Sequence, residues 1–146
     1  MPLRFEIANR QRRFSFRLPF LRSMARAAQP ACLEAVCHGD APLPGLGLVE
    51  VTLLSDAAIA AVHGEFFDDP TPTDVITFHH GEILLGAGIV AENARHYGRT
   101  PDEEAALCLI HGLLHLGGWE DLTPAEAKKM ARRQEQIFKT ARQMVG

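Results

Sequence analysis

The chain has 146 residues, of which 47% are hydrophobic, and a formal net charge of −3. This length suits one compact domain with its own hydrophobic core, and we expect residues 1–146 to form a single domain. No apolar run reaches the ~18 residues of a membrane span, and no apolar h-region follows Met1, so we expect neither a membrane protein nor a secreted one. Three cysteines without framework spacing, Cys32, Cys37 and Cys108, argue against a disulfide scaffold and favour the reducing cytoplasm.

The charges are distributed unevenly along the chain. Thirteen of the fifteen Lys and Arg residues fall within residues 1–26 or 128–146, and only Arg95 and Arg99 lie between them. If the two basic ends meet in space, they form a surface that suits phosphate groups. The alternative is two solvated faces that balance an acidic middle.

The first third of the chain is predicted to contain two extended segments and a helix. Residues 3–8 alternate between apolar and polar side chains, which is typical of a strand, and residues 12–17 are expected to be a second extended segment. Pro19 fits the first turn of a helix, and the apolar spacing extends this helix over residues 19–38. Glycines and prolines then predict a loop up to residue 47.

The middle third is predicted to place a helix among strands. Residues 48–54 read as a strand, and Ser55 is a good N-cap for a helix over residues 56–66. After a loop rich in Asp and Pro, residues 75–78 and 82–85 are again rich in β-formers and are separated by a glycine-containing turn.

The last third is predicted to be helical. A helix over residues 88–97 precedes a second one that Thr100 caps and Gly117-Gly118 stop, and Thr123 opens the last helix. The whole pattern predicts an α+β fold, with a small mixed sheet of about four strands packed by four to five helices.

A candidate metal site lies where the long predicted helix meets its glycine turn. His111 and His115 are four residues apart, so both imidazoles lie on one face of that helix. Gly118 can take a positive φ and turn the chain back, which lets Asp121 reach the same ion. Two His and one carboxylate leave a coordination position open for water, as in catalytic sites.

The spacing of these ligands is similar to that of the metzincin proteases, with one large difference. Those enzymes carry a Glu directly after the first His, where it acts as the general base. This chain has Gly112 at that position. Because the proton acceptor is missing, hydrolysis of a peptide is a less favoured alternative.

Two motifs resemble those of the YbeY endoribonuclease family. Residues 111–118 are similar to its HGxLHLxG signature, and residues 72–78, which read PTDVITF, resemble its PTDVLSF motif. Gly81-Glu82-Ile83 follows as in the family, and the resemblance extends from about residue 48 to the C-terminus. It implies an α+β fold, one divalent ion, most simply Zn²⁺, single-stranded RNA as substrate, and work on ribosomal RNA.

Two positions depart from the family pattern. The family usually ends its motif with a third His where this chain has Asp121, a harder ligand that makes Mn²⁺ or Fe²⁺ more acceptable. The family also carries Tyr-Arg where this chain reads Phe66-Phe67, so the cation expected to stabilise the scissile phosphate is missing. Arg95 and Arg99 are the only basic residues in the middle of the chain that could replace it as substrate-binding residues.

Other residues are alternatives to this set. Cys108 shares the helix face of His111 and could be a fourth ligand, although a buried apolar position is the simpler interpretation. Glu120 competes with Asp121 as a ligand or base. The remaining candidates are His79 and His80 as exposed turn residues or substrate contacts, Thr73 and Asp74 as braces of the strand, Trp119 as an anchor of the turn or a base-stacking residue, and His38, His63 and His96 as surface histidines.

The function that the resemblance implies is that of a single-strand-specific, metal-dependent endoribonuclease of rRNA maturation, which we expect to be cytoplasmic and associated with ribosomes. Because the cation is missing at Phe67, a ribosome-associated metal-binding protein with weak or lost nuclease activity is the alternative. A metallohydrolase of another substrate is the third possibility.

Overall fold

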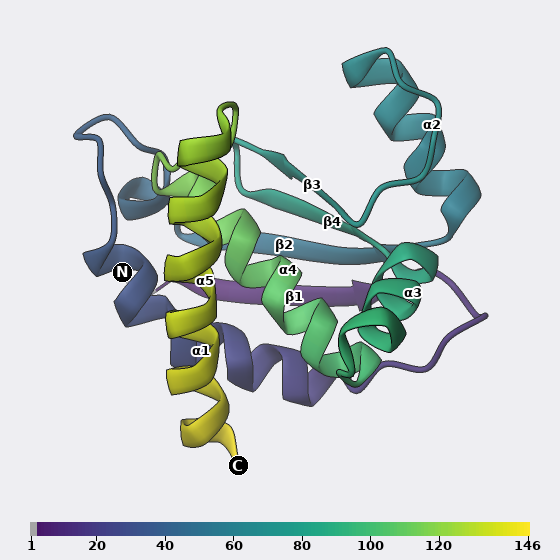
Figure 1. The fold of residues 1–146 in the computed structure, drawn as a ribbon, viewed down its shortest axis with the longest axis horizontal. Coiled ribbons are helices and arrows are strands. Elements are labelled where there is room, and N and C mark those ends of the chain that lie inside the picture. The colour runs from purple at the N-terminus through teal and green to yellow at the C-terminus, as the bar shows by residue number, and fades with distance from the viewer. Residues whose placement is uncertain (1–2) are drawn as a thin grey trace.

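The computed structural model describes residues 3–146. In this range four strands form one sheet in the order β1-β2-β4-β3, in which β1, β2 and β4 are parallel and β3 is antiparallel to β4 (Figure 1). The predicted α+β class, with a mixed four-stranded sheet and five helices, is confirmed. None of the helices within residues 3–146 is both long enough and apolar enough to cross a membrane. The elements are β1 (Arg4–Asn9), α1 (Leu18–Glu34), the 3-10 helix η1 (Leu43–Gly45), β2 (Leu48–Leu54), α2 (Asp56–Phe67), β3 (Val75–Phe78), β4 (Glu82–Gly86), α3 (Ala87–Tyr97), α4 (Pro101–Leu116) and α5 (Pro124–Val145).

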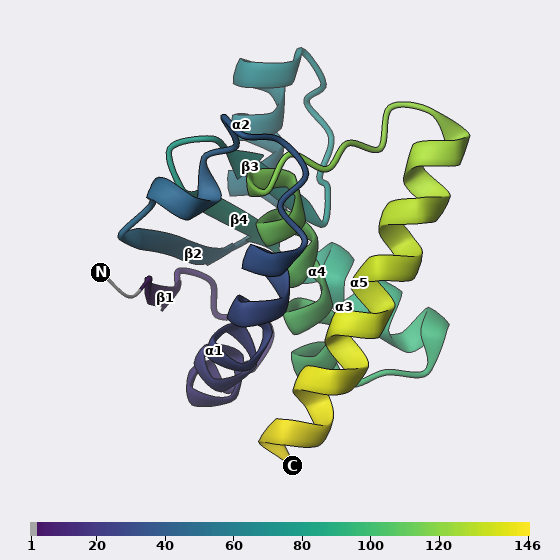
Figure 2. The ribbon, with the colours of Figure 1, turned by 90° about the vertical axis from the view of Figure 1, so that its left-hand side faces the viewer.

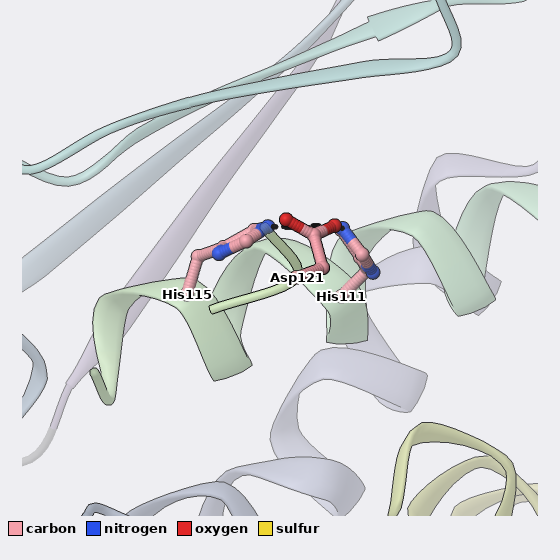
Figure 3. Close-up of side chains that lie close together, drawn as sticks. All are labelled: His111, His115 and Asp121. Carbon is pink, nitrogen blue, oxygen red and sulfur yellow. Dashed lines mark hydrogen bonds and ion pairs between the residues drawn. The ribbon is translucent and has the colours of Figure 1, made fainter. Parts of the chain in front are cut away.

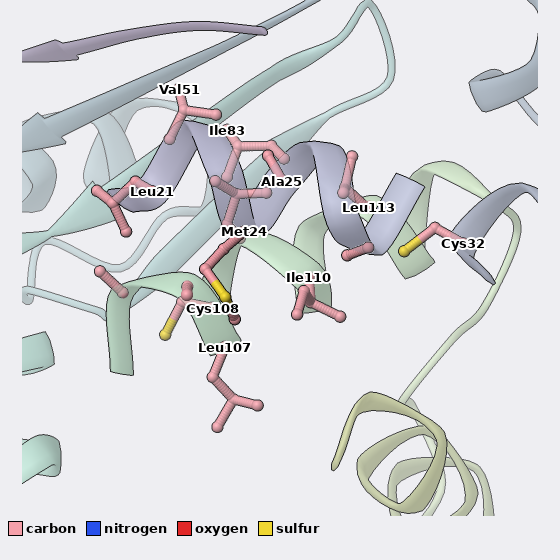
Figure 4. Packing of buried hydrophobic residues seen from close by; sticks show 14 of the residues in the cluster. Leu21, Met24, Ala25, Cys32, Val51, Ile83, Leu107, Cys108, Ile110 and Leu113 are labelled. Carbon is pink, nitrogen blue, oxygen red and sulfur yellow. The ribbon is translucent and has the colours of Figure 1, made fainter. Parts of the chain in front are cut away.

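The two faces of the sheet carry different apolar clusters, because successive strand residues point to opposite sides. Val51 and Ile83 belong to the large core, where they pack above helices α1 and α4 (Figure 4). Leu84, which points the other way, joins Ile76 and Ile59 of α2 in a small second cluster. Helices α1 and α4 therefore cover one face of the sheet, with α5 packed on their outer side (Figure 2), and α2 covers the β3–β4 end of the other face.

Helix α4 is the central element that positions the candidate site. From Glu104 to Gly117 every residue is buried except His111 and His115, which are only partly buried. A helix that is apolar nearly all round must be enclosed by its neighbours, and α1, α3, α5 and the sheet do this (Figures 1 and 2). The core therefore fixes the backbone from which the two histidines project.

Two sequence-based expectations for the first third need correction. Residues 12–17 form no strand, because the buried side chain of Gln11 bonds both the N–H of Phe14, at 2.9 Å, and its carbonyl, at 2.7 Å. These bonds hold the segment as an irregular loop. Helix α1 ends at Glu34 and not at residue 38, four residues beyond Pro30, which offers no N–H to the helix.

Candidate metal centre and its pocket

Three potential ligands converge at the C-terminal end of α4 (Figure 3). The Nε2 atoms of His111 and His115 lie 3.0 Å apart. One carboxylate oxygen of Asp121, Oδ2, lies 3.5 Å from Nε2 of His111 and 3.6 Å from Nε2 of His115. Within residues 3–146 this is the one group of His, Cys, Asp or Glu side chains whose donor atoms gather closely enough to share an ion.

Both imidazole rings are oriented by a hydrogen bond at the other nitrogen. Nδ1 of His115 donates to the backbone carbonyl of Trp119 at 2.9 Å, and Nδ1 of His111 donates to Oε1 of Gln134 on α5 at 2.7 Å. With the proton held on Nδ1, each neutral ring presents a lone pair on Nε2. Such partners are the usual means by which proteins fix the tautomer and direction of metal-binding histidines.

The charge state of His111 also favours metal binding. Burial lowers the pKa of His111 below the usual histidine value, and the neighbouring His115 lowers it further, while Gln134 and Asp121 raise it in part. The neutral ring is the form that binds a metal ion, because the ion must otherwise displace a proton.

The donor set fits a small divalent ion. Two ligands about 2.1 Å from a tetrahedral zinc ion lie about 3.4 Å apart. The three distances between donor atoms here, 3.0, 3.5 and 3.6 Å, bracket that value. With both Nδ1 atoms protonated, the two Nε2 lone pairs face each other at 3.0 Å and repel, and a cation held between them would remove this repulsion.

The turn after α4 brings Asp121 back over the helix. Gly118 has a φ of +96°, and a Cβ atom at this position would lie 2.8 Å from Cδ2 of His38. Only glycine meets both conditions without strain. Trp119, which follows Gly118, is itself anchored, because its indole Nε1–H donates to the carbonyl of Ala35 at 2.8 Å.

Gly112 explains in structural terms why no glutamate base follows the first histidine. A Cβ atom at Gly112 would lie 2.7 Å from Cδ1 of Ile83 and 3.0 Å from Oγ1 of Thr77. The helix packs directly against the sheet at this position, so a glutamate would have to displace the side chain of Ile83. The general base of a peptidase is therefore missing from the sequence, and the packing at Gly112 leaves little room for it.

A pocket of about 790 Å³ opens above the three ligands. His79, Trp119, Glu120 and Phe67 line it as well, but Glu120 is not one of the converging donors. His38 and His63, which the sequence suggested were plain surface histidines, also line it. Sequence reasoning missed them because they come from the loop before η1 and from α2, far from the metal motif in the chain.

The two candidate arginines lie outside the lining of this pocket. Arg95 is exposed on α3. Arg99 is bound to Glu104, at 3.2 Å, and to Glu135. A substrate contact from Arg99 would have to break these two ion pairs, so the structure gives no support to its predicted role.

Cys108 belongs to a separate buried cluster behind the ligands. Its Sγ lies 3.9 Å from Asp74 and 3.9 Å from Glu104, and burial raises the pKa of the thiol well above its usual range. A thiol with that pKa stays protonated and is a poor metal ligand. Of the other candidates, Thr73 contacts Asp74 and does not line the pocket, and His80 pairs with Glu82.

The chain is thus a small α+β protein whose candidate metal centre is formed by two histidines of α4 and an aspartate of the following turn, beside a mixed sheet. The family model described as "Endoribonuclease YbeY" matches residues 6–142, and the chain belongs to this family. The "Endoribonuclease YbeY" of Cutibacterium acnes is 34% identical over 107 residues, which cover 62% of this chain and 69% of that protein. The protein of the same name from an Exiguobacterium species is 31% identical over 134 residues, with 76% and 85% covered.

A solved structure shows the same architecture. The solution structure of TM1509 from Thermotoga maritima superposes with a TM-score of 0.63 at 26% sequence identity. The superposition covers 94% of this chain and 88% of that one. The similarity therefore includes the first third of the chain, which precedes the range of the motif resemblance.

Proposed function

We propose that this protein is a metal-dependent endoribonuclease that cleaves single-stranded RNA during the maturation of ribosomal RNA. The observation that carries the proposal is the convergence of His111, His115 and Asp121, with both rings oriented, in a chain of the YbeY family. We propose that residues 1–146 act as one catalytic domain, in the cytoplasm and in contact with ribosomes.

The three ligands would hold one divalent ion, and zinc suits the two nitrogen donors best. When bound, such an ion lowers the pKa of a water molecule and polarises a phosphate oxygen. Asp121 adds a negative charge to the site, which favours retention of the cation. Gln134 and the carbonyl of Trp119 keep the two rings in place while substrate enters.

The basic ends of the chain would supply the contact with the RNA backbone. Helices α1 and α5 lie side by side (Figures 1 and 2), and Arg142 of α5 lies 5.2 Å from the ring centre of Phe20 of α1. The part of the N-terminal basic segment that lies on α1, with Arg22 and Arg26, is therefore next to α5, whereas the other five arginines of this segment precede α1. We call α1 and α5 the basic helix pair; its exposed cations include Arg26, Lys128, Lys129, Arg132 and Lys139.

Helix α5 also connects this pair to the metal centre, because Gln134 on its inner side binds His111. The exposed lysines and arginines of α5 lie on its other side, and no residue of α5 lines the pocket. An RNA whose phosphates contact these cations would have to continue past the edge of α5 to reach the ligands.

A ribosome-associated protein with weak nuclease activity is the second candidate, and one observation favours it. Among the residues that line the pocket there is no Lys or Arg. Without such a cation, charge that develops on the phosphate would depend on the metal ion and on histidines alone.

The two candidates are separated by a cleavage assay on single-stranded and double-stranded RNA of one sequence. We expect internal cleavage of the single strand, loss of activity after chelation, and its return when Zn²⁺ or Mn²⁺ is added. His111→Ala and His115→Ala should abolish cleavage, whereas His96→Ala, at an exposed histidine outside the pocket, should not. Binding of RNA without any metal-dependent cleavage would decide for the second candidate.

A further inference from the structure

Five aromatic rings form a connected cluster at the outer ends of α2 and β3. Phe66 and Phe67 are 59% and 53% exposed, which is unusual for side chains of this size. The ring centres are 5.8 Å apart for His63 and Phe67, 6.4 Å for Phe67 and Phe78, 5.2 Å for Phe66 and Phe78, and 5.7 Å for Phe78 and His80. We call these five residues the aromatic cluster.

Two rings of the aromatic cluster are held in place by the rest of the protein. Phe78 is partly buried and packs against the small core of Ile59, Ile76 and Leu84. Nδ1 of His63 donates to the carbonyl of Thr71 at 2.8 Å, which holds that ring as well. A ligand that binds to rings already held in place loses little conformational entropy in ordering them.

The cluster is continuous with the metal-site pocket. His63 and Phe67 line the same pocket as His111 and His115, while Phe66, Phe78 and His80 extend the aromatic surface away from it. A group that stacks on these outer rings can therefore belong to the same molecule that reaches the metal centre.

The charges around the cluster identify what it can bind. Asp69 lies 4.0 Å from His63 and Glu82 lies 3.2 Å from His80, while Glu65 and Asp68 flank Phe66 and Phe67 in the chain. Residues 27–94 contain no Lys or Arg. A phosphate would be repelled here. The face of a nucleobase is neutral, and its amino groups can donate hydrogen bonds to carboxylates at the rim.

We propose that the aromatic cluster is a stacking site for nucleobases of a single-stranded RNA whose backbone lies at the metal centre. The inference rests on the proposed function and names a substrate subsite within it. It places bases on the acidic, aromatic side of the pocket and phosphates on the side of the basic helix pair. A duplex cannot use the site, because its bases are already paired and stacked.

The test compares two single-stranded oligoribonucleotides that differ only in their bases. One carries a normal base at every position, and the other has several abasic nucleotides, which keep the phosphates. Fluorescence anisotropy with the wild-type protein, at constant salt and with chelator present to prevent cleavage, should show at least about tenfold tighter binding of the strand that has its bases.

Variants then assign the preference to the rings. The double variant Phe66→Ala, Phe67→Ala should bind both strands equally, and Phe67→Tyr, which keeps an aromatic ring, should retain the preference. Tyr97→Ala removes another exposed aromatic, 63% exposed on α3 and outside the pocket, and should change nothing. Equal affinity of the wild type for both strands, or a preference that survives the double variant, would overturn the proposal.

The remaining outcomes separate this inference from the proposed nuclease. A preference for bases without metal-dependent cleavage would refute the nuclease and leave the stacking site standing. Metal-dependent cleavage at equal rates of the normal and abasic strands would support the nuclease and refute the stacking site. A dimer that the double variant dissociates, with RNA affinity unchanged, would assign the rings to a second copy of the chain and also overturn the proposal.

Discussion

Gln134 of α5 accepts a 2.7 Å hydrogen bond from Nδ1 of His111 on α4, and so joins the candidate metal centre to the helix that carries most of the C-terminal basic residues. Bonds of this kind keep a ligand ring aimed at its ion. The same contact places one side of α5 against the ligands while Lys128, Lys129 and Arg132 remain exposed on the other.

Gln134→Ala should therefore weaken metal binding about 10- to 100-fold without unfolding the protein. Competition with a chromophoric chelator gives the dissociation constant, and circular dichroism checks the fold. Gln136→Ala changes an exposed glutamine two residues away and should leave the affinity as it is. Identical affinities in the two variants would show that the ring of His111 needs no such support.

Asp121→His should retain the metal or bind it more tightly, because an imidazole replaces a carboxylate oxygen as the third ligand and restores the residue usual in the family. Metal analysis of the purified variant and the same chelator competition measure this. Glu120→His introduces a histidine one position earlier, outside the converging donors, and should not reproduce the effect. Loss of the metal in Asp121→His would mean that the turn cannot present the larger ring.

Gly118→Ala tests the turn itself. A side chain here meets both a φ of +96° and the ring of His38 at 2.8 Å, so we expect the free energy of unfolding to fall by about 1–3 kcal/mol and the metal to be held more weakly. Gly98→Ala is the control, since its φ is +70° but no atom lies within 4 Å of the added Cβ. Chemical denaturation of both variants separates crowding from backbone strain. If both lose the same stability, His38 plays no part.

Much of the fold, and the convergence of the three candidate ligands, could be predicted because the signals are local. His111, His115 and Asp121 lie within one helix and its turn, so helical periodicity and one glycine are enough to bring them together. Strands β1 and β2 alternate between buried and more exposed residues as expected, whereas four successive residues of β4 are buried. The segment 12–17 was misjudged because the side chain of Gln11, and not a neighbouring strand, bonds the backbone there.

The parts that could not be predicted depend on contacts between distant elements. Gln134 reaches His111 only because α4 and α5 pack together, and His63 enters the pocket only because α2 lies over the end of β3 and β4. No periodicity marks either residue. The ion pairs of Arg99 with Glu104 and Glu135 likewise appear only in three dimensions.

The basic helix pair predicts a salt-dependent affinity for RNA. Each phosphate contact that is lost lowers the slope of log affinity against log salt by about 0.7 for a single strand. Replacing Lys128, Lys129 and Arg132 with Ala should therefore reduce the slope by about two units, whereas Arg95→Ala, on α3, should not change it. An affinity that stays constant from low to high salt would remove these helices from the RNA path.

Phe67→Arg is the sharpest test of catalysis. Phe67 lines the pocket at the position where the family pattern carries an arginine, and no Lys or Arg shares that lining. Cleavage of a phosphodiester builds negative charge on oxygens that the present pocket can neutralise only through the metal ion and histidines. A guanidinium there should raise the turnover number about a hundredfold, with the metal content unchanged.

Because a guanidinium plane also stacks on bases, the affinity of Phe67→Arg for RNA should fall less than that of Phe67→Ala. Phe66→Arg adds the same charge one residue earlier, outside the pocket lining, and is the matched control. Single-turnover cleavage of a single-stranded RNA compares the three variants with the wild type. Fast cleavage by the wild type that neither arginine increases would mean that the metal centre alone stabilises the phosphate, and that Phe67 contributes to binding only.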